Sequence, residues 1–220
     1  MERTDTTLIR LFNEHGRKLL YERGDTIIRA GDTPSGVYLI TDGWVKVYSL
    51  CENGEPNIIM SLGEADIFPL DWAIGGSLRD VSFTALETTS VLRAPRDWFL
   101  QNLKSDRKVC ESVLLKSLDY LGRMSEELEC LPYRSARERV AFRLVSLARH
   151  FSKPASGRAA LELRVPNEYI ARSSNMTRET ASREISWLAR KHIIEHRNGH
   201  IIINNLPALE KEAGKSLRLP

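Results

Sequence analysis

The sequence predicts an α+β fold in three parts: an N-terminal antiparallel β-roll of the jelly-roll kind, a long helix, and a C-terminal domain of helices and a hairpin. Three observations predict it. Short β-rich runs separated by turn residues fill residues 19–94, a spacing typical of small antiparallel rolls. An apolar repeat of helical period follows at residues 105–131. Residues 165–204 then change from helical periodicity to two isoleucine-rich runs.

The first part, residues 1–104, begins with a short helix at about residues 8–11 and a loop at residues 13–18. Asp42-Gly43 separates two β-rich runs and is a hairpin signal, and residues 52–55 are predicted to form a second turn before the next run. A roll of this size either holds one small ligand or is solidly packed. The sequence leaves both alternatives open.

The second part, residues 105–132, is predicted to be a helix that Ser105 or Asp106 caps and Pro132 ends, with a hinge at Pro132-Tyr133. One face repeats with spacings of four and three, which is a strict a/d seam over three heptads. We interpret this seam as a parallel two-stranded coiled coil with an identical chain. The alternative is a helix that lies on the roll, whose apolar stripe would be wider. The seam consists of Cys110, Leu114, Ser117, Leu121, Met124, Leu128 and Leu131.

The third part, residues 133–220, reads as a winged helix-turn-helix domain. An amphipathic helix at residues 134–151 and an exposed loop at residues 152–160 come first. A short helix at residues 167–172 and a polar turn at residues 173–176 lead to a second helix. The hairpin that follows carries Asn198-Gly199, a type I′ turn signal. Thr177 is placed to cap the second helix, which buries one face through Ala181, Ile185 and Leu188.

The opposite face of that second helix carries the chemistry of base recognition. Arg makes a bidentate pair with the O6 and N7 edge of guanine, Glu accepts from the cytosine amine, and Ser serves either partner. These side chains occupy the first two turns, the part of a recognition helix that reaches base edges in the major groove. The predicted base-reading residues are Arg178, Glu179, Ser182 and Arg183, and the predicted phosphate contacts are Thr177, Thr180, Asn167 and Ser174.

Charge is distributed in a way that suits a nucleic-acid binder. Residues 134–203 contain 14 Arg and Lys against 6 Glu and no Asp, a net charge of +8, whereas the remainder contains 18 basic and 23 acidic residues, a net charge of −5. Three widely spaced cysteines, Cys51, Cys110 and Cys130, form no CxxC motif and fit a reducing cytoplasm. No apolar run approaches the ~20 residues of a membrane span, and residues 1–5 begin no signal peptide.

Three stretches resemble the Crp/Fnr family of bacterial transcription regulators, and the resemblance covers about residues 8–209. Residues 36–47 resemble the family's β-roll signature. Residues 137–141 resemble the start of its first DNA-domain helix, and residues 177–183 resemble its recognition-helix motif. The resemblance implies a homodimer that reads a palindrome with half-sites one helical turn apart. It also implies RNA polymerase as a partner, because the loop at residues 153–160 matches a polymerase-contacting surface.

The resemblance implies two alternative sequences for the DNA half-site. Arg178, Glu179 and Arg183 match the base-reading triad of the cyclic-AMP receptor branch. Glu179, Ser182 and Arg183 match the trio of the oxygen-sensing Fnr branch. The half-site is therefore expected to be similar to TGTGA or to TTGAT. Thr177 and Thr180 match phosphate-contacting positions.

The sensing half departs from both branches, and we expect no cofactor and no metal. In cyclic-nucleotide binders a Gly-Glu pair holds the ribose and an Arg-Ser pair the cyclic phosphate; here Pro69-Leu70 and Arg79-Asp80 stand there. Asp80 would repel a phosphate, which disfavours cyclic AMP. Residues 1–50 contain no cysteine, which argues against an iron–sulfur cluster.

Haem is disfavoured because His15 is the only histidine of the sensory half. Cys51, beside a turn, is a candidate oxidant sensor. An unknown small-molecule effector remains open, and its candidate pocket consists of Phe68, Leu70, Trp72 and Arg79.

No catalytic constellation, P-loop or HExxH motif is present, so the sequence argues against an enzyme. The function that it favours is a sequence-specific, double-stranded DNA-binding transcription regulator, homodimeric and gated by a signal at the roll. The alternatives are a regulator that is constitutively competent to bind DNA and a redox- or haem-dependent sensor.

Overall fold

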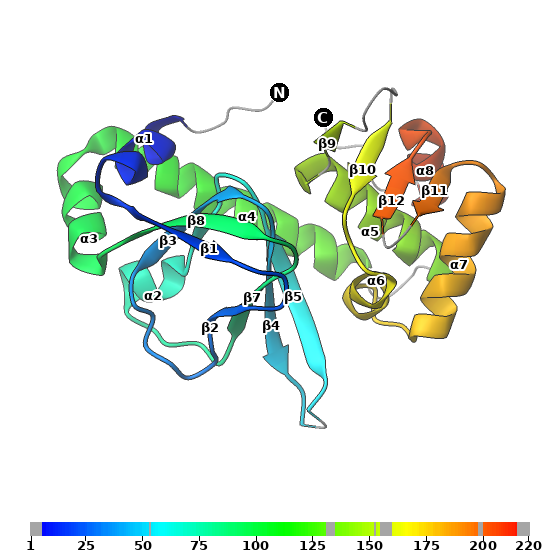
Figure 1. Ribbon diagram of the computed structural model, residues 1–220, viewed down its shortest axis with the longest axis horizontal. Helices are drawn as coiled ribbons and strands as arrows, with labels where there is room; N and C mark the ends of the chain where they lie inside the picture. The colour runs from blue at the N-terminus through cyan, green and yellow to red at the C-terminus, as the bar shows by residue number, and fades with distance from the viewer. Residues whose placement is uncertain are drawn as a thin grey trace. The chain divides into compact units, whose positions relative to one another are not determined.

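The computed structural model describes residues 6–52, 54–130, 135–151, 153–154, 160–197 and 200–214. The chain forms two compact units, Met1–Ser125 and Glu126–Pro220, which we call the roll unit and the C-terminal unit. The first contains an antiparallel β-roll with helices against it, and the second contains helices and a small sheet (Figure 1). This confirms the predicted α+β class. None of the helices described is long and apolar enough to cross a bilayer.

The roll consists of two four-stranded sheets with the strand orders β1-β8-β3-β6 and β2-β7-β4-β5. Every strand pair in them is antiparallel. The strands are β1 (Arg17–Tyr21), β2 (Thr26–Ile28), β3 (Val37–Asp42), β4 (Val45–Leu50), β5 (Pro56–Leu62), β6 (Ile67–Phe68), β7 (Ser82–Ala85) and β8 (Thr89–Ala94).

Strand β3 separates two hydrophobic clusters because successive side chains of a strand point to opposite faces. Val37 and Leu39 belong to an outer cluster with residues of four helices, whereas Tyr38 and Ile40 belong to an inner cluster between the sheets. The strand is therefore buried on both faces. The inner cluster consists of Ile28, Tyr38, Ile40, Val45, Val47, Leu62, Phe68, Phe83 and Val91.

One predicted hairpin is wrong. Asp42-Gly43 does not join paired strands, because β3 and β4 lie in different sheets. Gly43 has φ +90°, and a Cβ there would lie 2.7 Å from the Thr88 carbonyl oxygen and 2.6 Å from the Thr89 hydroxyl. The Asp-Gly pair therefore makes a tight corner where the chain passes from one sheet to the other. The predicted turn at residues 52–55 separates β4 from β5, and these two strands pair with each other.

The helices of the roll unit are α1 (Thr6–His15), α2 (Leu70–Gly75), α3 (Arg96–Ser105) and α4 (Arg107–Cys130). Helix α1 occupies part of the predicted loop at residues 13–18, because Leu8 and Phe12 bury one face of it in the outer cluster. Helices α2 and α3 were not predicted. Asp106 begins α4 as predicted, and its Oδ1 accepts a hydrogen bond from the Lys108 N–H at 2.8 Å.

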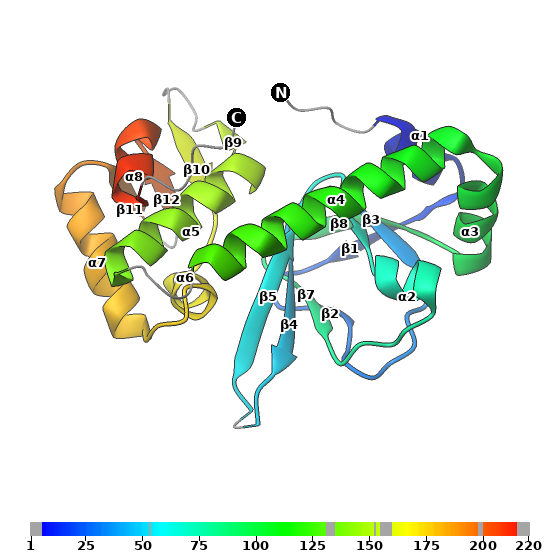
Figure 2. The same ribbon diagram turned by 180° about the vertical axis from the view of Figure 1, so that it is seen from behind.

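Helix α4 runs along the roll, in front of the strands in Figure 2. Val109 and Val113 are buried in the outer cluster, so this helix does lie on the roll, as the alternative reading proposed. The opposite side keeps apolar residues in solvent, and Leu115 and Leu118 widen it beyond the predicted seam. The Cys110 thiol is exposed, and the Ser117 hydroxyl donates to the Val113 carbonyl at 2.9 Å. The side chain of Leu128, with Leu131 and the Pro132-Tyr133 hinge, lies outside the described residues. Among the α4 side chains that the structure describes, the large apolar ones that are exposed are Leu114, Leu115, Leu118, Leu121 and Met124.

The C-terminal unit has helices α5 (Ala136–Phe151), α6 (Asn167–Ser173), α7 (Arg178–Arg190) and α8 (Leu206–Glu212). A sheet of order β11-β12-β10-β9 contains β9 (Lys153–Pro154), β10 (Leu161–Leu163), β11 (Ile194–Arg197) and β12 (His200–Ile203). A capping box starts α5, since Ser135 and Glu138 exchange backbone-to-side-chain hydrogen bonds. The predicted loop at residues 152–160 contributes β9, and α8 was not predicted.

Candidate nucleic-acid interface

Helix α7 begins at the predicted cap. The Thr177 hydroxyl oxygen accepts from the Thr180 N–H at 3.2 Å, and Thr177 is in extended backbone. Ala181, Ile185 and Leu188 are buried, as their spacing predicts. The N–H groups of the first turn and the positive end of the helix dipole suit this end of α7 to meet a phosphate.

The four predicted base-reading residues lie together on the exposed side of α7. Arg178, Glu179, Ser182 and Arg183 are all exposed, and the Arg183 side chain is 70% accessible to solvent. All four belong to the first two turns. The structure thus presents two guanidinium groups, a carboxylate and a hydroxyl on one helical surface, which is the donor and acceptor set that the major groove requires.

A buried carboxylate lies directly beneath this surface. Glu184 is 8% exposed although it is charged. Its Oε2 accepts from Arg137 Nε at 3.1 Å, and its Oε1 lies 3.5 Å from Arg183 Nε. The Arg137 guanidinium also lies over the Trp187 ring at 3.7 Å. Sequence reasoning missed Glu184, but one signal was available: it stands at i+3 from Ala181, on the apolar face, where a carboxylate needs a partner.

The turn between α6 and α7 is held by arginines of α5. Arg139 Nε donates to the Ser174 carbonyl at 3.1 Å, and Arg143 donates to the Ser173 carbonyl. Both carbonyls lie near the end of α6, where helical partners run out. The two contacts therefore fix the turn that positions α7, and the sequence analysis did not identify either arginine.

Two of the predicted phosphate contacts are poorly placed for that role. Ser174 is only 5% exposed, so its hydroxyl is not presented to solvent. Asn167 is half-buried at the start of α6, and its Oδ1 is buried. Thr177 is exposed and Thr180 is half-buried at the start of α7. The structure thus corrects the prediction for Ser174 and weakens it for Asn167.

The predicted wing is present as the antiparallel pair β11–β12, with Arg197 opposite His200. The Asn198-Gly199 turn itself lies outside the described residues. The wing is part of a larger sheet, since β12 also pairs with β10. A side-chain contact links these two strands, where His200 Nδ1 lies 2.6 Å from Glu162 Oε1.

The predicted effector pocket is wrong, because its residues do not converge. Phe68 is buried in the inner cluster, whereas Leu70 and Trp72 pack against the outer cluster from α2. Phe68 lies in strand β6, and Leu70 and Trp72 follow it in α2. Because of the strand's alternation and the start of the helix, Phe68 lies on one side of the sheet and the other two side chains lie on the opposite side. Arg79 is largely exposed and forms an ion pair with Asp71 at 3.0 Å.

Three aromatic rings stack on one another in the inner cluster of the roll, among six aliphatic side chains. Tyr38 stacks on Phe68 at 5.1 Å between ring centroids, and Phe68 stacks on Phe83 at 5.0 Å. A cavity of about 220 Å³ lies instead beside the β2–β3 loop, and none of the four predicted pocket residues lines it. In the part of the chain that the structure describes, no group of three His, Cys, Asp or Glu side chains is placed to hold a metal ion.

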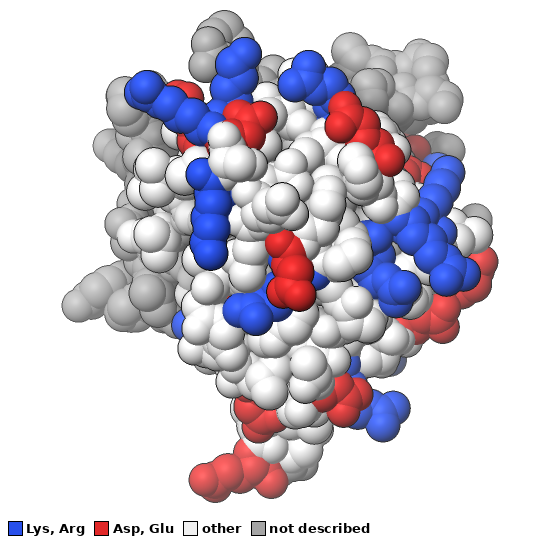
Figure 3. Space-filling model, turned by 90° about the vertical axis from the view of Figure 1, so that its left-hand side faces the viewer, with Lys and Arg blue, Asp and Glu red and all other residues white. Residues whose placement is uncertain are grey.

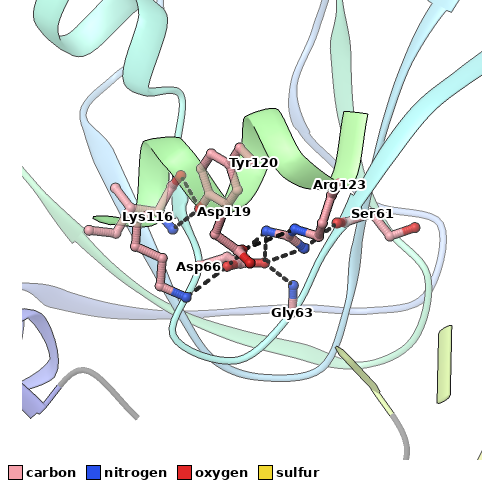
Figure 4. A network of polar contacts seen from close by, with 8 residues as sticks. Ser61, Gly63, Asp66, Lys116, Asp119, Tyr120 and Arg123 are labelled. Carbon is pink, nitrogen blue, oxygen red and sulfur yellow. Dashed lines mark hydrogen bonds and ion pairs between the residues drawn. The ribbon is translucent and has the colours of Figure 1, made fainter. Parts of the chain in front are cut away.

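A polar cluster connects α4 to the roll (Figure 4). Its contacts were not predicted from the sequence. Asp66, which is 4% exposed, lies 3.0 Å from Lys116 Nζ and 3.2 Å from Arg123 Nη2. The Gly63 N–H also donates to this carboxylate at 2.9 Å. The Tyr120 hydroxyl accepts from the Ile67 N–H at 2.9 Å and donates to its carbonyl at 3.1 Å. Burial raises the pKa of Tyr120 well above 10.0, and the nearby Asp66 carboxylate raises it further.

Figure 3 shows the charged side chains on one side of the molecule. There, lysine and arginine side chains lie interspersed with aspartate and glutamate over a largely uncharged surface.

Comparisons with known proteins agree with this assignment. Residues 18–106 match the cyclic nucleotide-binding domain, and residues 138–212 match the Crp-like helix-turn-helix domain. The global nitrogen regulator of Synechococcus elongatus is 28% identical over 220 residues, with 94% of this chain and 97% of the relative covered.

Two solved structures have the same fold. FixK2 from Bradyrhizobium japonicum aligns with a TM-score of 0.77 at 23% identity, over 89% of this chain and 96% of that chain. A transcriptional regulator of the CRP/FNR family from Thermus thermophilus aligns with a TM-score of 0.73 at 20% identity, over 90% and 98%. The two matched domains and the relatives are those of regulators and not of enzymes. The chain belongs to the Crp/Fnr family of transcription regulators, and its helix-turn-helix domain binds double-stranded DNA.

Proposed function

We propose that the chain works as a homodimer that reads a palindromic operator through Arg178, Glu179, Ser182 and Arg183. The observation that carries this proposal is their joint exposure on the first two turns of α7. A two-fold dimer presents this surface twice, so half-sites one helical turn apart are expected. The half-site is similar to TGTGA or TTGAT, as the motif at residues 177–183 implies.

The exposed side of α4 supports the homodimer. Leu114, Leu118 and Leu121 recur at i, i+4 and i+7 on this helix, and Leu121 is 62% exposed. Burial of a leucine side chain contributes roughly 1.5–3 kcal/mol, so pairing with the same surface of a second copy would be favourable. Cys110 and Met124 extend the surface at its two ends. RNA polymerase belongs to the proposal as the partner of the segment at residues 153–160, on the strength of the family resemblance alone.

For the sensory half we propose DNA binding that needs no effector, in preference to gating by a ligand inside the roll. The stacked rings of Tyr38, Phe68 and Phe83 take the space that a ligand between the sheets would need. Arg79, the residue left from the phosphate-binding pair, is engaged with Asp71 and followed by Asp80. Both observations disfavour cyclic AMP.

One binding experiment tests these proposals together. Full-length protein is titrated into labelled duplexes with TGTGA or TTGAT palindromes and into a scrambled duplex, and anisotropy is recorded with and without cyclic AMP. We expect preference for one palindrome, two chains per duplex by sedimentation, and no effect of cyclic AMP. Equal affinity for the scrambled duplex would refute sequence-specific reading. One chain per duplex would refute the dimer, and a large gain with cyclic AMP would refute effector independence.

A further inference from the structure

The environment of Glu184 suggests a role in how α7 reads DNA. A carboxylate that is 8% exposed needs compensating charge, and Glu184 has an arginine on each oxygen. Arg137 Nε donates to Oε2 at 3.1 Å, and Arg183 Nε forms an ion pair with Oε1 at 3.5 Å. One of these arginines belongs to α5, and the other is a predicted base-reading residue.

Arg137 is itself held in place. Its guanidinium lies 3.7 Å from the centroid of the Trp187 ring, within the range of a strong cation–π contact. Lys191 Nζ lies 5.6 Å from the same ring. Arg137 is therefore fixed by a ring and a carboxylate together, and it fixes Glu184 in turn. The order of contacts is Trp187 to Arg137, Arg137 to Glu184, and Glu184 to Arg183.

We propose that Glu184 is a positioning residue that aims the Arg183 guanidinium, and that it thereby determines specificity at the base pair that Arg183 reads. Arg137 and Trp187 hold Glu184 for this task. The inference rests on the proposed function, because it assigns a partner to one of the base-reading side chains.

The geometry of the ion pair suits this role. Glu184 contacts Arg183 through Nε, so the two Nη groups, which make the bidentate contact to guanine, are not required for it. Arg183 is 70% exposed, and a free arginine side chain of this length samples many rotamers. An anchor near Cδ reduces that freedom before DNA is met. Preorganised side chains bind with less loss of entropy and tolerate fewer alternative partners.

A merely structural Glu184 would behave differently. If it served only to join α5 to α7, its loss would lower the stability of the C-terminal unit and weaken binding to every DNA sequence alike. A positioning residue affects one base pair of the half-site. Glu184→Gln also removes a negative charge near DNA, so non-specific affinity should stay equal or rise slightly.

The test measures discrimination rather than affinity alone. Wild type, Arg183→Ala, Glu184→Gln and the control Glu210→Gln are titrated against the preferred palindrome and a panel with each base pair of the half-site changed in turn. Arg183→Ala identifies the base pair that Arg183 reads. We expect Glu184→Gln to lower discrimination there by about threefold to tenfold, since a good bidentate contact sets the upper limit. Glu210→Gln breaks the Arg149–Glu210 ion pair of the same unit at 3.0 Å and should leave all ratios unchanged.

Three outcomes decide the matter. A uniform loss over all duplexes in Glu184→Gln, or unchanged discrimination at the Arg183 base pair, overturns the positioning role. If Glu184→Gln does not fold by circular dichroism, Glu184→Asp serves in its place, because it keeps the charge but withdraws the carboxylate from Arg183 Nε; the same localised loss is expected. If wild type itself does not discriminate between the duplexes, the proposed function fails, and this result is distinct from failure of the positioning role alone.

Discussion

In the roll unit, the carboxylate of Asp66 is buried against Lys116 and Arg123, and all three groups are occupied with one another. In the C-terminal unit, Arg178 and Arg183 lie exposed on α7, with a buried carboxylate placed under one of them. Both units therefore bury a carboxylate beside basic side chains. In the roll unit both basic groups hold α4, whereas in the C-terminal unit only Arg137 is engaged in this way and Arg183, which is 70% exposed, remains usable for recognition.

The interior of the roll unit is likewise occupied by side chains of the chain itself. The rings of Tyr38, Phe68 and Phe83 stack between the sheets of the roll. The Tyr120 hydroxyl of α4 forms hydrogen bonds with the backbone of Ile67. Such an arrangement favours a rigid support for α4 over a container for a ligand. The contrast is therefore between a unit whose buried ion pairs hold a helix in place and a unit whose exposed arginines are available to a partner.

The largest effect is expected at the exposed surface. Arg183→Ala removes a bidentate contact worth about 1–3 kcal/mol from each half-site, so a dimer loses roughly twice that in operator binding. Because the Arg183 side chain is 70% exposed and Arg137 remains in contact with Glu184, thermal stability should change little. Anisotropy titration against the preferred palindrome measures the first quantity, and circular dichroism melting measures the second.

Sedimentation supplies the control for this variant, since the α4 surface is intact and the oligomeric state should match wild type. A variant that still protects the same operator at wild-type concentrations would show that α7 does not read the bases.

The second effect concerns the buried carboxylate of the roll unit. Asp66→Asn leaves Lys116 and Arg123 facing an uncharged amide, and breaking a buried pair of this kind costs about 3 kcal/mol. The free energy of unfolding, measured by denaturant titration of the full chain, should fall by that amount for the transition of the roll unit. Operator affinity at low temperature should change less than in Arg183→Ala.

Asp119→Asn is the matched control, because Asp119 also pairs with Arg123, at 3.1 Å, but is 45% exposed. Loss of an exposed pair costs about 0–1 kcal/mol. Equal destabilisation by the two variants would mean that burial of Asp66 is not what gives the cluster its strength.

Alkaline pH tests the contact of Tyr120. Its pKa in the folded chain is raised above 10.0, first by burial and then by Asp66. Above pH 10 the unfolded chain loses this proton and the folded chain keeps it, so stability that is complete below pH 10 is lost as pH rises. Tyr120→Phe should lower stability at pH 7 by about 1 kcal/mol, the value of a net hydrogen bond, and flatten the alkaline decline.

Tyr21, whose pKa is also raised by burial, accounts for the decline that remains in this variant. Denaturation midpoints at pH 8 to 11 give the comparison. An alkaline decline as steep as that of wild type would assign it to other groups.

The exposed surface of α7 was predictable from the sequence, and the contacts of the buried Glu184 beneath it were not. Helical period places Ala181, Ile185 and Leu188 inward, and the same period places Arg178 and Arg183 outward. Thr177 caps α7 through contacts within three residues, which local sequence encodes. Glu184 depends on Arg137, 47 positions away, and no local pattern identifies that partner.

The roll shows where local signals fail. Asp42-Gly43 has the composition of a hairpin turn, yet only the pairing of β3 with β8 and β6 shows that the chain changes sheets there. Phe68, Leu70 and Trp72 lie within five positions but divide between two clusters, because the chain passes from strand to helix among them. Asp66 and Arg123 are 57 positions apart, so their contact is set by tertiary structure alone.

The smallest effect is expected in the sheet that carries the wing. A hydrogen bond from His200, and to a smaller degree the charge of Arg164, lower the pKa of Glu162 below its ordinary value of 4.5. A carboxylate with a lowered pKa contributes stability that is present above pH 4.5 and is lost as pH falls through the folded pKa. Glu162→Gln should therefore reduce the acid-induced loss of stability between pH 5 and pH 3 and change stability at pH 7 by less than about 1 kcal/mol. Melting temperatures over that range measure the difference, with Glu168→Gln, which breaks the exposed Glu168–Arg172 pair, as the control. The melting temperature of Glu162→Gln could instead fall between pH 5 and pH 3 as steeply as that of wild type. In that case the Glu162–His200 contact does not hold β10 to β12, and the wing sheet depends on its buried isoleucines.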